Sequence, residues 1–312
     1  MLRRVAGWLL ALLLLGGTAG VLSRYVDLPS RLLAVVQSLV PLWCVLVVVA
    51  TLAATWRHRR LAVAGLVPSV VALALLGAPY LRRTVPPGPG ALTVMSANLE
   101  FGQADATQVV AAVQAHDVAV LVLLEVTPDA VRRLSAAGLD GLLPATAGSA
   151  EPGAEGSLVR SRWPLTALAD GDGPAGTPSA FRQPLVRVQR PGAPFVLQAV
   201  HPLPPTAWEP QWRTSLTRLA ELRRARPTDE PLVLAGDFNA TDDHPLFRRV
   251  ADGMSDVARD AGEGWAPTWP QDADVPPFAR IDHVLVRGFS TVAAGTVHLD
   301  GTDHAAAWGT VR

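Results

Sequence analysis

Residues 231–239 read PLVLAGDFN, an apolar run that ends in an acid and an amide. A short run of this kind, rich in Val and Leu and bounded by Pro and Gly, is typical of a buried β-strand. Three other runs have the same form and end at Asn98, Glu125 and His201. In α/β proteins, polar side chains at strand ends meet above the core and build active sites. The four runs therefore predict an α/β domain with a polar pocket at its strand ends.

Helical patterns separate some of these apolar runs. We expect helices at residues 104–115, 128–137, 209–226 and 243–252. We expect buried strands at residues 92–98, 118–125, 195–201 and 231–237, and closing strands at 281–286, 291–298 and 305–311. Two segments rich in Gly, Ala and Pro are expected to be loops, at 147–156 and 171–179.

The first 90 residues differ in charge from the rest of the chain. They carry nine Arg and one acid, Asp27, whereas residues 91–312 carry 18 Arg and 26 acids. Three stretches without charged side chains lie at 5–22, 32–56 and 61–81. Each is long enough to cross a hydrocarbon layer of about 30 Å as a helix. Pro41 and Pro68 are points at which the second and third helices can kink.

The chain therefore has three expected parts: a membrane domain with three transmembrane helices over 1–83, a Pro/Gly linker over 84–91, and an α/β domain over 92–312. The Arg-rich segment 57–60 is expected in the cytoplasm, because cytoplasmic loops carry an excess of Lys and Arg. Three spans then place the α/β domain outside the cytoplasm, attached to the cell membrane. An alternative for the first stretch is a cleaved signal peptide, which followed by two spans gives the same sidedness.

Composition excludes several functional classes. All 27 basic residues are Arg, which excludes lysine Schiff-base and P-loop chemistry. The single cysteine, Cys44, excludes a disulfide framework and a zinc site made of cysteines. With 49% hydrophobic and 17% charged residues, the chain is too apolar to be disordered.

The side chains at the strand ends suit phosphate chemistry on a divalent cation. Glu125 and Asp237 supply carboxylates, Asn239 supplies an amide, and Asp303-His304 supplies a carboxylate beside an imidazole. Mg²⁺ prefers carboxylate, water and phosphate oxygens. Phosphoester hydrolysis needs a cation on the phosphate oxygens, a base for water, and donors for the charge of the transition state. These residues together provide each of them.

Several blocks, in order along the chain, resemble the endonuclease/exonuclease/phosphatase superfamily. They are SANLEFG (96–102), LLEV (123–126), GSLVRSRWPL (156–165), VHPLPP (200–205), GDFNAT (236–241), RIDHVLV (280–286) and TDH (302–304). The resemblance covers about residues 92–312. The three preceding spans and the His-Pro-Leu-Pro-Pro block resemble a membrane-anchored bacterial branch that includes VanJ-like proteins associated with teicoplanin resistance.

The resemblance implies a four-layer α/β sandwich, the DNase I-like fold, in which two mixed sheets pack together between layers of helices. It also implies Mg²⁺ or Mn²⁺ and in-line attack of water on a phosphoester or phosphoanhydride. Glu125 corresponds to the main metal ligand of the family, and Asn98 supports the metal-site carboxylates and the phosphate. Asp303 is implied as a second acidic ligand or as a residue next to the metal.

The same resemblance implies the catalytic roles. Asp237 orients or deprotonates the attacking water, and Asn239 donates to the phosphoryl oxygens. His304 stabilises the phosphoryl charge while Asp282 holds its imidazole, since a carboxylate partner fixes the tautomer of a histidine and favours its charged form. His201 is implied to donate to a phosphate oxygen.

Two further residues are candidates for substrate binding. Arg280 is a candidate phosphate ligand, with an ion pair as the alternative. Trp269 is a candidate wall of the substrate site, with core packing as the alternative. His283 follows Asp282 in a predicted strand, so it is expected to point to the opposite face. The histidines expected to be structural are His116, His244 and His298.

Charge and tethering bias the choice of substrate. Residues 91–312 carry a net charge of −8, whereas duplex binding is normally driven by a basic face. A membrane tether raises the effective concentration of membrane-resident substrates. We therefore expect a metal-dependent phosphohydrolase whose partner is a membrane lipid phosphate or a polyprenyl pyrophosphate of the cell envelope. The alternatives are an extracytoplasmic nuclease and a membrane-anchored binding module without catalysis.

Overall fold

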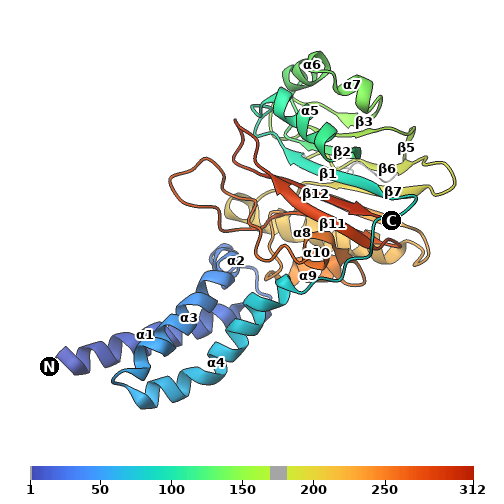
Figure 1. The fold of residues 1–312 in the computed structure, drawn as a ribbon. Helices are drawn as coiled ribbons and strands as arrows, with labels where there is room; N and C mark the ends of the chain where they lie inside the picture. The colour runs from blue at the N-terminus through green and yellow to red at the C-terminus, as the bar shows by residue number, and fades with distance from the viewer. Residues whose placement is uncertain (1, 169–180) are drawn as a thin grey trace.

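The computed structural model describes residues 2–168 and 181–312 and shows a bundle of helices attached to an α/β domain (Figure 1). The bundle contains α1 (Leu2–Leu22), α2 (Arg31–Ser38), α3 (Val40–Thr55) and α4 (Arg59–Gly77), with short 3-10 helices at Ser23–Tyr25 and Ala78–Tyr80. The helices α1 and α4 both pack against α3. The N-terminus lies at the end of the bundle away from the α/β domain (Figure 1).

The second apolar stretch is not the single helix that the sequence predicts over 32–56. It is divided into α2 and α3, which are bent by 62° at Leu39. The helix α3 begins with Pro41 in its first turn, where the missing N–H of proline needs no partner. In contrast, Pro68 lies within the continuous helix α4. By length and composition, α1 and α4 can each cross a membrane, and the bent pair makes a third span if it is counted as one.

Two six-stranded mixed sheets form the centre of the α/β domain. Their strand orders are β11-β12-β1-β2-β4-β3 and β5-β6-β7-β8-β10-β9. The strands are β1 (Leu92–Asn98), β2 (Val118–Leu124), β3 (Ala145–Ser149), β4 (Ser157–Ser161), β5 (Leu165–Ala167), β6 (Leu185–Val188), β7 (Phe195–Val200), β8 (Leu232–Asp237), β9 (Ser255–Asp256), β10 (Asp282–Arg287), β11 (Thr291–Val297) and β12 (Ala306–Val311).

Three hydrophobic cores connect the four layers. The inner faces of the sheets pack on each other, for example through Val120 of the first sheet and Val233 of the second. The outer face of the first sheet is covered by α5 (Ala106–Ala115), α6 (Pro128–Ala136) and α7 (Leu139–Leu142). The outer face of the second is covered by α8 (Pro205–Ala225) and α9 (Pro245–Ala251). A further short helix, α10 (Val257–Ala261), packs on β10 and β11. The predicted four-layer α/β sandwich is confirmed.

The predicted buried strands agree with the structure to within one residue at either end. The predicted loop at 147–156 is wrong in its first part, because residues 147–149 belong to β3 and pair with β4. The short strands β3, β4, β5 and β6 were not predicted from the apolar runs. The other predicted loop, at 171–179, lies outside the described residues.

The bundle is held to the α/β domain by more than the linker. Arg24 pairs with Asp243 at 2.8 Å, and Asp27 pairs with Arg213 at 2.7 Å. His244 donates its Nε2–H to the carbonyl of Ala34 in α2, at 2.9 Å. Ala34 is itself buried in the core beneath α8 and α9. These contacts fix α2 against the face of the α/β domain that carries the loop after Asp237.

Candidate active site

A pocket of about 1370 Å³ lies at the ends of the four buried strands. Three of the four strand ends that the sequence singles out line it, through Glu125, His201 and Asp237. The predicted residues that line it are Glu125, His201, Asp237, Asn239, Trp269, Asp303 and His304. Asn98 and Asp282 lie directly behind this lining, where they bond to Glu125 and His304.

Glu125 is held in place by β1 and the loop that follows it. Its Oε1 accepts from Asn98 Nδ2 at 3.2 Å, and its Oε2 accepts from the backbone N–H of Phe101 at 3.0 Å. The strands β1 and β2 are parallel neighbours, so Asn98 and Glu125 emerge at the same edge. Burial raises the pKa of the Glu125 carboxyl, and the nearby carboxylate of Asp303 raises it further.

Asp237 is positioned by a glycine. At Gly236 a Cβ atom would overlap the carbonyl oxygen of Val200, so only glycine allows β7 and β8 to approach this closely. The Asp237 carboxylate accepts the backbone N–H of Asn239 at 2.7 Å and its side-chain Nδ2 at 3.2 Å. Burial raises the pKa of Asp237 to about 8, although the charge of His304 opposes this shift.

Asp282 and His304 form a close pair beside Asp237. In the antiparallel pairing of β10 with β8, Asp282 stands directly opposite Asp237. His304 donates its Nδ1–H to Asp282 Oδ2 at 2.9 Å, and its Nε2 lies 3.8 Å from Asp237 Oδ2. Burial disfavours the imidazolium, but Asp282, Asp237 and Asp303 outweigh it and raise the pKa of His304 to about 10. His304 is therefore a cation at neutral pH.

His201 faces the same carboxylates but has the opposite character. Its Nε2 lies 3.7 Å from Glu125 Oε1 and 4.0 Å from Asp237 Oδ2. Its ring packs on Phe181, with centroids 4.4 Å apart. Burial, helped by the positive charge of His304, lowers the pKa of His201 to about 3. A neutral imidazole carries one N–H, so His201 can donate to a phosphate oxygen without bringing a charge.

The donor set of the pocket suits a hard divalent cation. Glu125, Asn98 and Asp303 offer carboxylate and amide oxygens, which Mg²⁺ and Mn²⁺ prefer. In the described part of the chain, two groups of three potential ligands have their ligand atoms within 4.8 Å of one another, and both lie outside the pocket. They are Asp242–Asp256–His283 and Asp272–His298–Asp300. Mg²⁺ usually binds through one or two carboxylates plus waters and substrate phosphates. The ligand atoms of the pocket are spaced more widely than in those two groups, which fits a cation that completes its coordination with waters and phosphate oxygens.

Arg280 does not line the catalytic pocket. Its guanidinium is 4% exposed and is bonded to Asp242 and to Asp256, the latter at 3.0 Å. The two carboxylates use its donors, so the geometry does not support Arg280 as a phosphate ligand and favours the ion-pair alternative. The predicted orientation of His283 agrees with the structure: it bonds to Asp256 Oδ2 at 2.9 Å and to the carbonyl of Ala240, away from the pocket.

Sequence reasoning missed the supporting roles of several residues that shape the site. Glu100 accepts the backbone N–H of Asp303 and lines the pocket. The buried hydroxyl of Thr268 accepts the backbone N–H groups of Ile281 and Asp282, at 3.1 and 3.2 Å. Thr268 is 14 residues from Asp282, so no local spacing could have revealed it. The Thr302 hydroxyl donates to the carbonyl of Asn98, which joins the His304 loop to β1.

Backbone strain is concentrated at the same place. Glu100, Phe101, Glu125 and Asn239 all have φ between 43° and 53°, a left-handed conformation that costs energy for residues other than glycine. Such conformations persist where the surrounding structure enforces them, and they cluster at functional sites.

A family model matches most of the chain. Residues 95–304 match the Endonuclease/Exonuclease/phosphatase family. The chain belongs to this family. Members of the family hydrolyse phosphoesters and typically use divalent metals. No match was found among curated proteins.

Solved structures of this family share the fold. TDP2 from D. rerio, complexed with a single-strand DNA product, is similar with a TM-score of 0.56 and 16% identity, covering 72% of this chain and 99% of that chain. Truncated TDP2 from Caenorhabditis elegans gives a TM-score of 0.57 and 16% identity, covering 71% and 98%. An endonuclease/exonuclease/phosphatase from Beutenbergia cavernae DSM 12333 gives 0.51 and 21%, covering 71% of each chain.

Proposed function

We propose that this protein is a membrane-anchored, divalent-metal-dependent hydrolase of lipid phosphates, for example a polyprenyl pyrophosphate of the cell envelope. One observation carries the proposal. The wall of the catalytic pocket includes Ser38, at the break between α2 and α3. The pocket that holds Glu125 and Asp237 therefore adjoins the apolar bundle, where the head group of a membrane lipid would lie.

The chemistry follows from the pocket residues. A cation held by Glu125, Asn98 and Asp303 would polarise the phosphate oxygens. Asp237 accepts the proton of the attacking water, and a pKa near the working pH suits such a base. As the water oxygen bonds to phosphorus, the bond from phosphorus to the leaving oxygen breaks.

Two kinds of donor stabilise the developing charge. His304 is cationic and fixed by Asp282, so it acts as a preorganised positive charge beside the phosphoryl oxygens. Asn239 would donate to the same oxygens only by exchanging the bond that its Nδ2 makes to the Asp237 carboxylate at 3.2 Å. Its Nδ2 also donates to the carbonyl of Pro202 at 3.0 Å, which fixes the direction of the amide. His201 supplies a further neutral donor.

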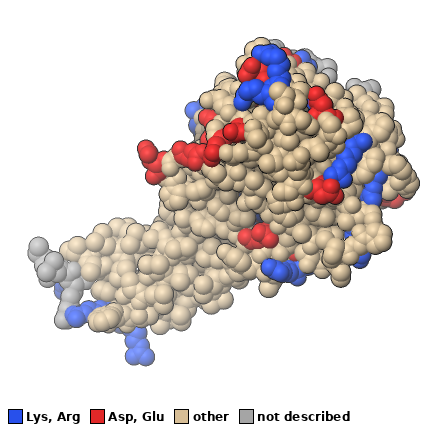
Figure 2. All heavy atoms as spheres, turned by 45° about the horizontal axis from the view of Figure 1, so that its top comes forward, with Lys and Arg blue, Asp and Glu red and all other residues tan. Residues whose placement is uncertain are grey.

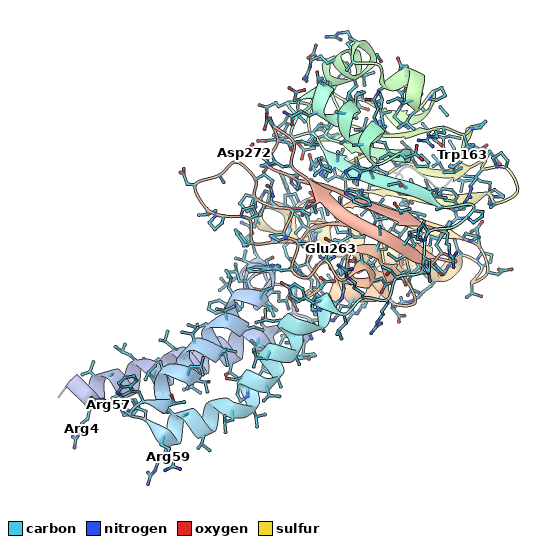
Figure 3. All side chains as sticks on the ribbon, in the orientation of Figure 1. Arg4, Arg57, Arg59, Trp163, Glu263 and Asp272 are labelled. Carbon is cyan, nitrogen blue, oxygen red and sulfur yellow. The ribbon has the colours of Figure 1, made fainter. Side chains whose placement is uncertain are left out.

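The charge of the bundle supports an extracytoplasmic catalytic domain. Arg4, Arg57 and Arg59 lie at the end of the bundle away from the α/β domain (Figure 3). The face of the bundle in Figure 2 shows no charged side chain along most of its length, with arginines at the far end. Because Arg favours the cytoplasmic side, the α/β domain would lie on the other side of the cell membrane.

The lining of the pocket favours a small phosphate head group over a polynucleotide. In the described part of the lining, Glu100, Glu151 and Glu155 add carboxylates to the catalytic ones, against one arginine, Arg182. A long polyanion is normally bound by a basic surface. At the same lining, Phe101 and Trp208 are 55% and 49% exposed, which suits an apolar neighbour of the phosphate.

The test is an assay of substrate choice with the full-length protein in lipid nanodiscs and Mg²⁺. We expect release of phosphate from a polyprenyl pyrophosphate and no cleavage of plasmid or single-stranded DNA. The activity should be lost in Asp237→Ala and kept in His298→Ala, since His298 is exposed and does not line the pocket. DNA cleavage with intact lipid would contradict the proposal.

A nuclease is the second candidate, because one similar structure, TDP2 from D. rerio, is a complex with a single-strand DNA product. The same assay separates the two. If neither substrate is cleaved by the wild-type protein with Mg²⁺ or Mn²⁺, the remaining alternative is a binding module without catalysis.

A further inference from the structure

Two cavities meet where the bundle joins the α/β domain. The catalytic pocket reaches Ser38 of α2 and Phe278 of the α/β domain. A second cavity, of about 80 Å³, lies at the domain ends of α3 and α4 and is lined by the same two residues. Ser38 and Phe278 thus form the partition between the catalytic pocket and the interior of the bundle.

A row of aromatic side chains leads across this partition. Trp269 donates its Nε1–H to the Asp303 carboxylate at 2.8 Å, and its ring meets Phe278 edge to face with centroids 5.6 Å apart. Trp265 donates its Nε1–H to the carbonyl of Phe278 at 2.9 Å and lines the second cavity. The row places Trp269 and Phe278 on the wall of the catalytic pocket, and Phe278 and Trp265 on the wall of the second cavity.

The second cavity is apolar on its membrane side. The helices contribute Val40, Pro41, Cys44, Leu75, Leu76 and Pro79 to its wall. The charged residues of its wall are Arg24, Arg259 and Arg280 with Asp242 and Asp243. Each arginine has a carboxylate partner, because Arg24 pairs with Asp243 while Arg280 and Arg259 both pair with Asp242. A wall with paired charges and apolar helices accepts a hydrocarbon more readily than a charged group.

We infer that this cavity, the chain cleft, receives the hydrocarbon chain of a lipid phosphate whose head group occupies the catalytic pocket. The inference rests on the proposed function of that pocket. The chain passes Ser38 and Phe278 and leaves at the domain ends of α3 and α4 into the bilayer, since 80 Å³ holds only a few methylene groups and the two helices pack closely beyond Cys44. The ligand is a lipid that carries a single hydrocarbon chain on its phosphate, because the cavity offers one path from the catalytic pocket to the bilayer. Burial of methylene groups then makes the enzyme selective for long chains.

The first experiment reads where the chain lies. The full-length protein in nanodiscs is irradiated with an alkyl monophosphate that carries a diazirine in the middle of its chain. We expect cross-links to Cys44, Leu75 or Leu76 that an excess of unlabelled alkyl monophosphate removes. The matched probe without the phosphate should label only outward-facing positions such as Leu42, which is 42% exposed.

The second experiment reads chain selectivity. The ratio of kcat/KM for hexadecyl phosphate to that for butyl phosphate should fall at least about tenfold in Cys44→Phe, because excluding two methylene groups from an apolar site loses this much affinity. The control Leu42→Phe adds a ring to the lipid-facing side of the same helix and should leave the ratio unchanged.

The outcomes separate the inference from the proposed function. Phosphate release together with cross-links confined to outward-facing positions would overturn the chain cleft and leave the function in place. Competable cross-links in the cleft without any phosphate release would overturn the function and leave the cleft in place. An unchanged chain-length ratio in Cys44→Phe, in a protein that keeps its melting temperature, would also contradict the cleft.

Discussion

Neighbouring residues of β10 build two clusters of the same residue types with opposite properties. Asp282 bonds to His304 at 2.9 Å on the pocket side, and His283 bonds to Asp256 at 2.9 Å on the other side. The second cluster contains Arg280, whose charge holds the pKa of the Asp256 carboxyl well below its usual range despite burial. Within the described residues, no arginine pairs with Asp237, Asp282 or His304, and burial raises the pKa of Asp237 instead.

The difference between the two clusters lies in their charge balance, which suits the cluster around Arg280 to a structural role and the pocket cluster to a role in catalysis. Balanced charges around Arg280 lock the loop after Asp237 in place. In the proposed mechanism, the unbalanced carboxylates of the pocket would supply a base, keep His304 cationic and hold a divalent cation. A close His–Asp pair alone therefore does not mark an active site in this protein.

The largest expected effect comes from removing the base. Asp237→Asn keeps the shape of the side chain but cannot accept a proton from water, so kcat should fall by about 10²–10⁴-fold. The measurement is phosphate release from a lipid monophosphate at saturating Mg²⁺. A loss of less than about threefold would show that Asp237 is not the base.

Breaking the balanced cluster should affect stability instead. Arg280→Met removes the buried cation shared by Asp242 and Asp256 and leaves them with Arg259 and His283 as their remaining partners. The free energy of unfolding should fall by up to about 3 kcal/mol. Activity per folded molecule should change little, because Arg280 does not line the pocket. If kcat falls while the melting temperature is kept, Arg280 binds substrate after all.

The pH dependence should reveal the unbalanced charge. The unfolded chain releases the Asp237 proton near pH 4, whereas the folded protein keeps it until about pH 8. The contribution of Asp237 to the free energy of unfolding of the wild-type protein therefore falls as pH rises from about 4 to 8, by up to about 1.4 kcal/mol per pH unit.

The comparison of wild type with Asp237→Asn isolates this effect. Without divalent metal, the melting temperature of the variant minus that of the wild type should increase as pH rises from about 4 to 8. Parallel curves for the two proteins would contradict the raised pKa.

The smallest expected effect concerns the attachment of the bundle. Asp243→Asn removes the partner of Arg24 at a half-buried position, which should cost about 1–2 kcal/mol. Hydrogen exchange should become faster in the loop 241–244, where His244 bonds to α2. Asp129→Asn is the matched control, since the pairs of Asp129 with Arg132 and Arg133 are exposed. Equal exchange in the two variants would show that this ion pair does not hold the bundle.

The sequence predicts the central strands of the two sheets better than the strands at or near their edges. Strands buried on both faces, such as β1 and β8, appear as continuous apolar runs, and their polar ends identify the pocket. The strands β5 and β6 are short and lie on or near a sheet edge, so their sequence carries little of this signal. From the sequence we expect one helix over 32–56 that can kink at Pro41, whereas the structure has two helices that meet at Leu39.

The weaker predictions concern contacts between distant parts of the chain. Arg280 stands two residues before Asp282 in the sequence, yet in the fold its guanidinium pairs with Asp242 and Asp256. Thr268 supports Asp282 from a separate loop, and only the fold brings the two together. The docking of α2 on α8 and on the loop before α9, where His244 bonds to Ala34, has no local sequence pattern.

The most direct test compares two carboxylates that each hold a histidine at 2.9 Å. The measurement is the rate of phosphate release from a lipid monophosphate, per folded molecule, in Asp282→Asn and in Asp256→Asn. We predict a loss of about 10²–10³-fold in Asp282→Asn, because His304 loses the charge that keeps it cationic and oriented. We predict a nearly unchanged rate in Asp256→Asn, with a lower melting temperature. Equal losses of rate in the two variants, or a loss confined to Asp256→Asn, would contradict the assignment of the pocket cluster as the catalytic one.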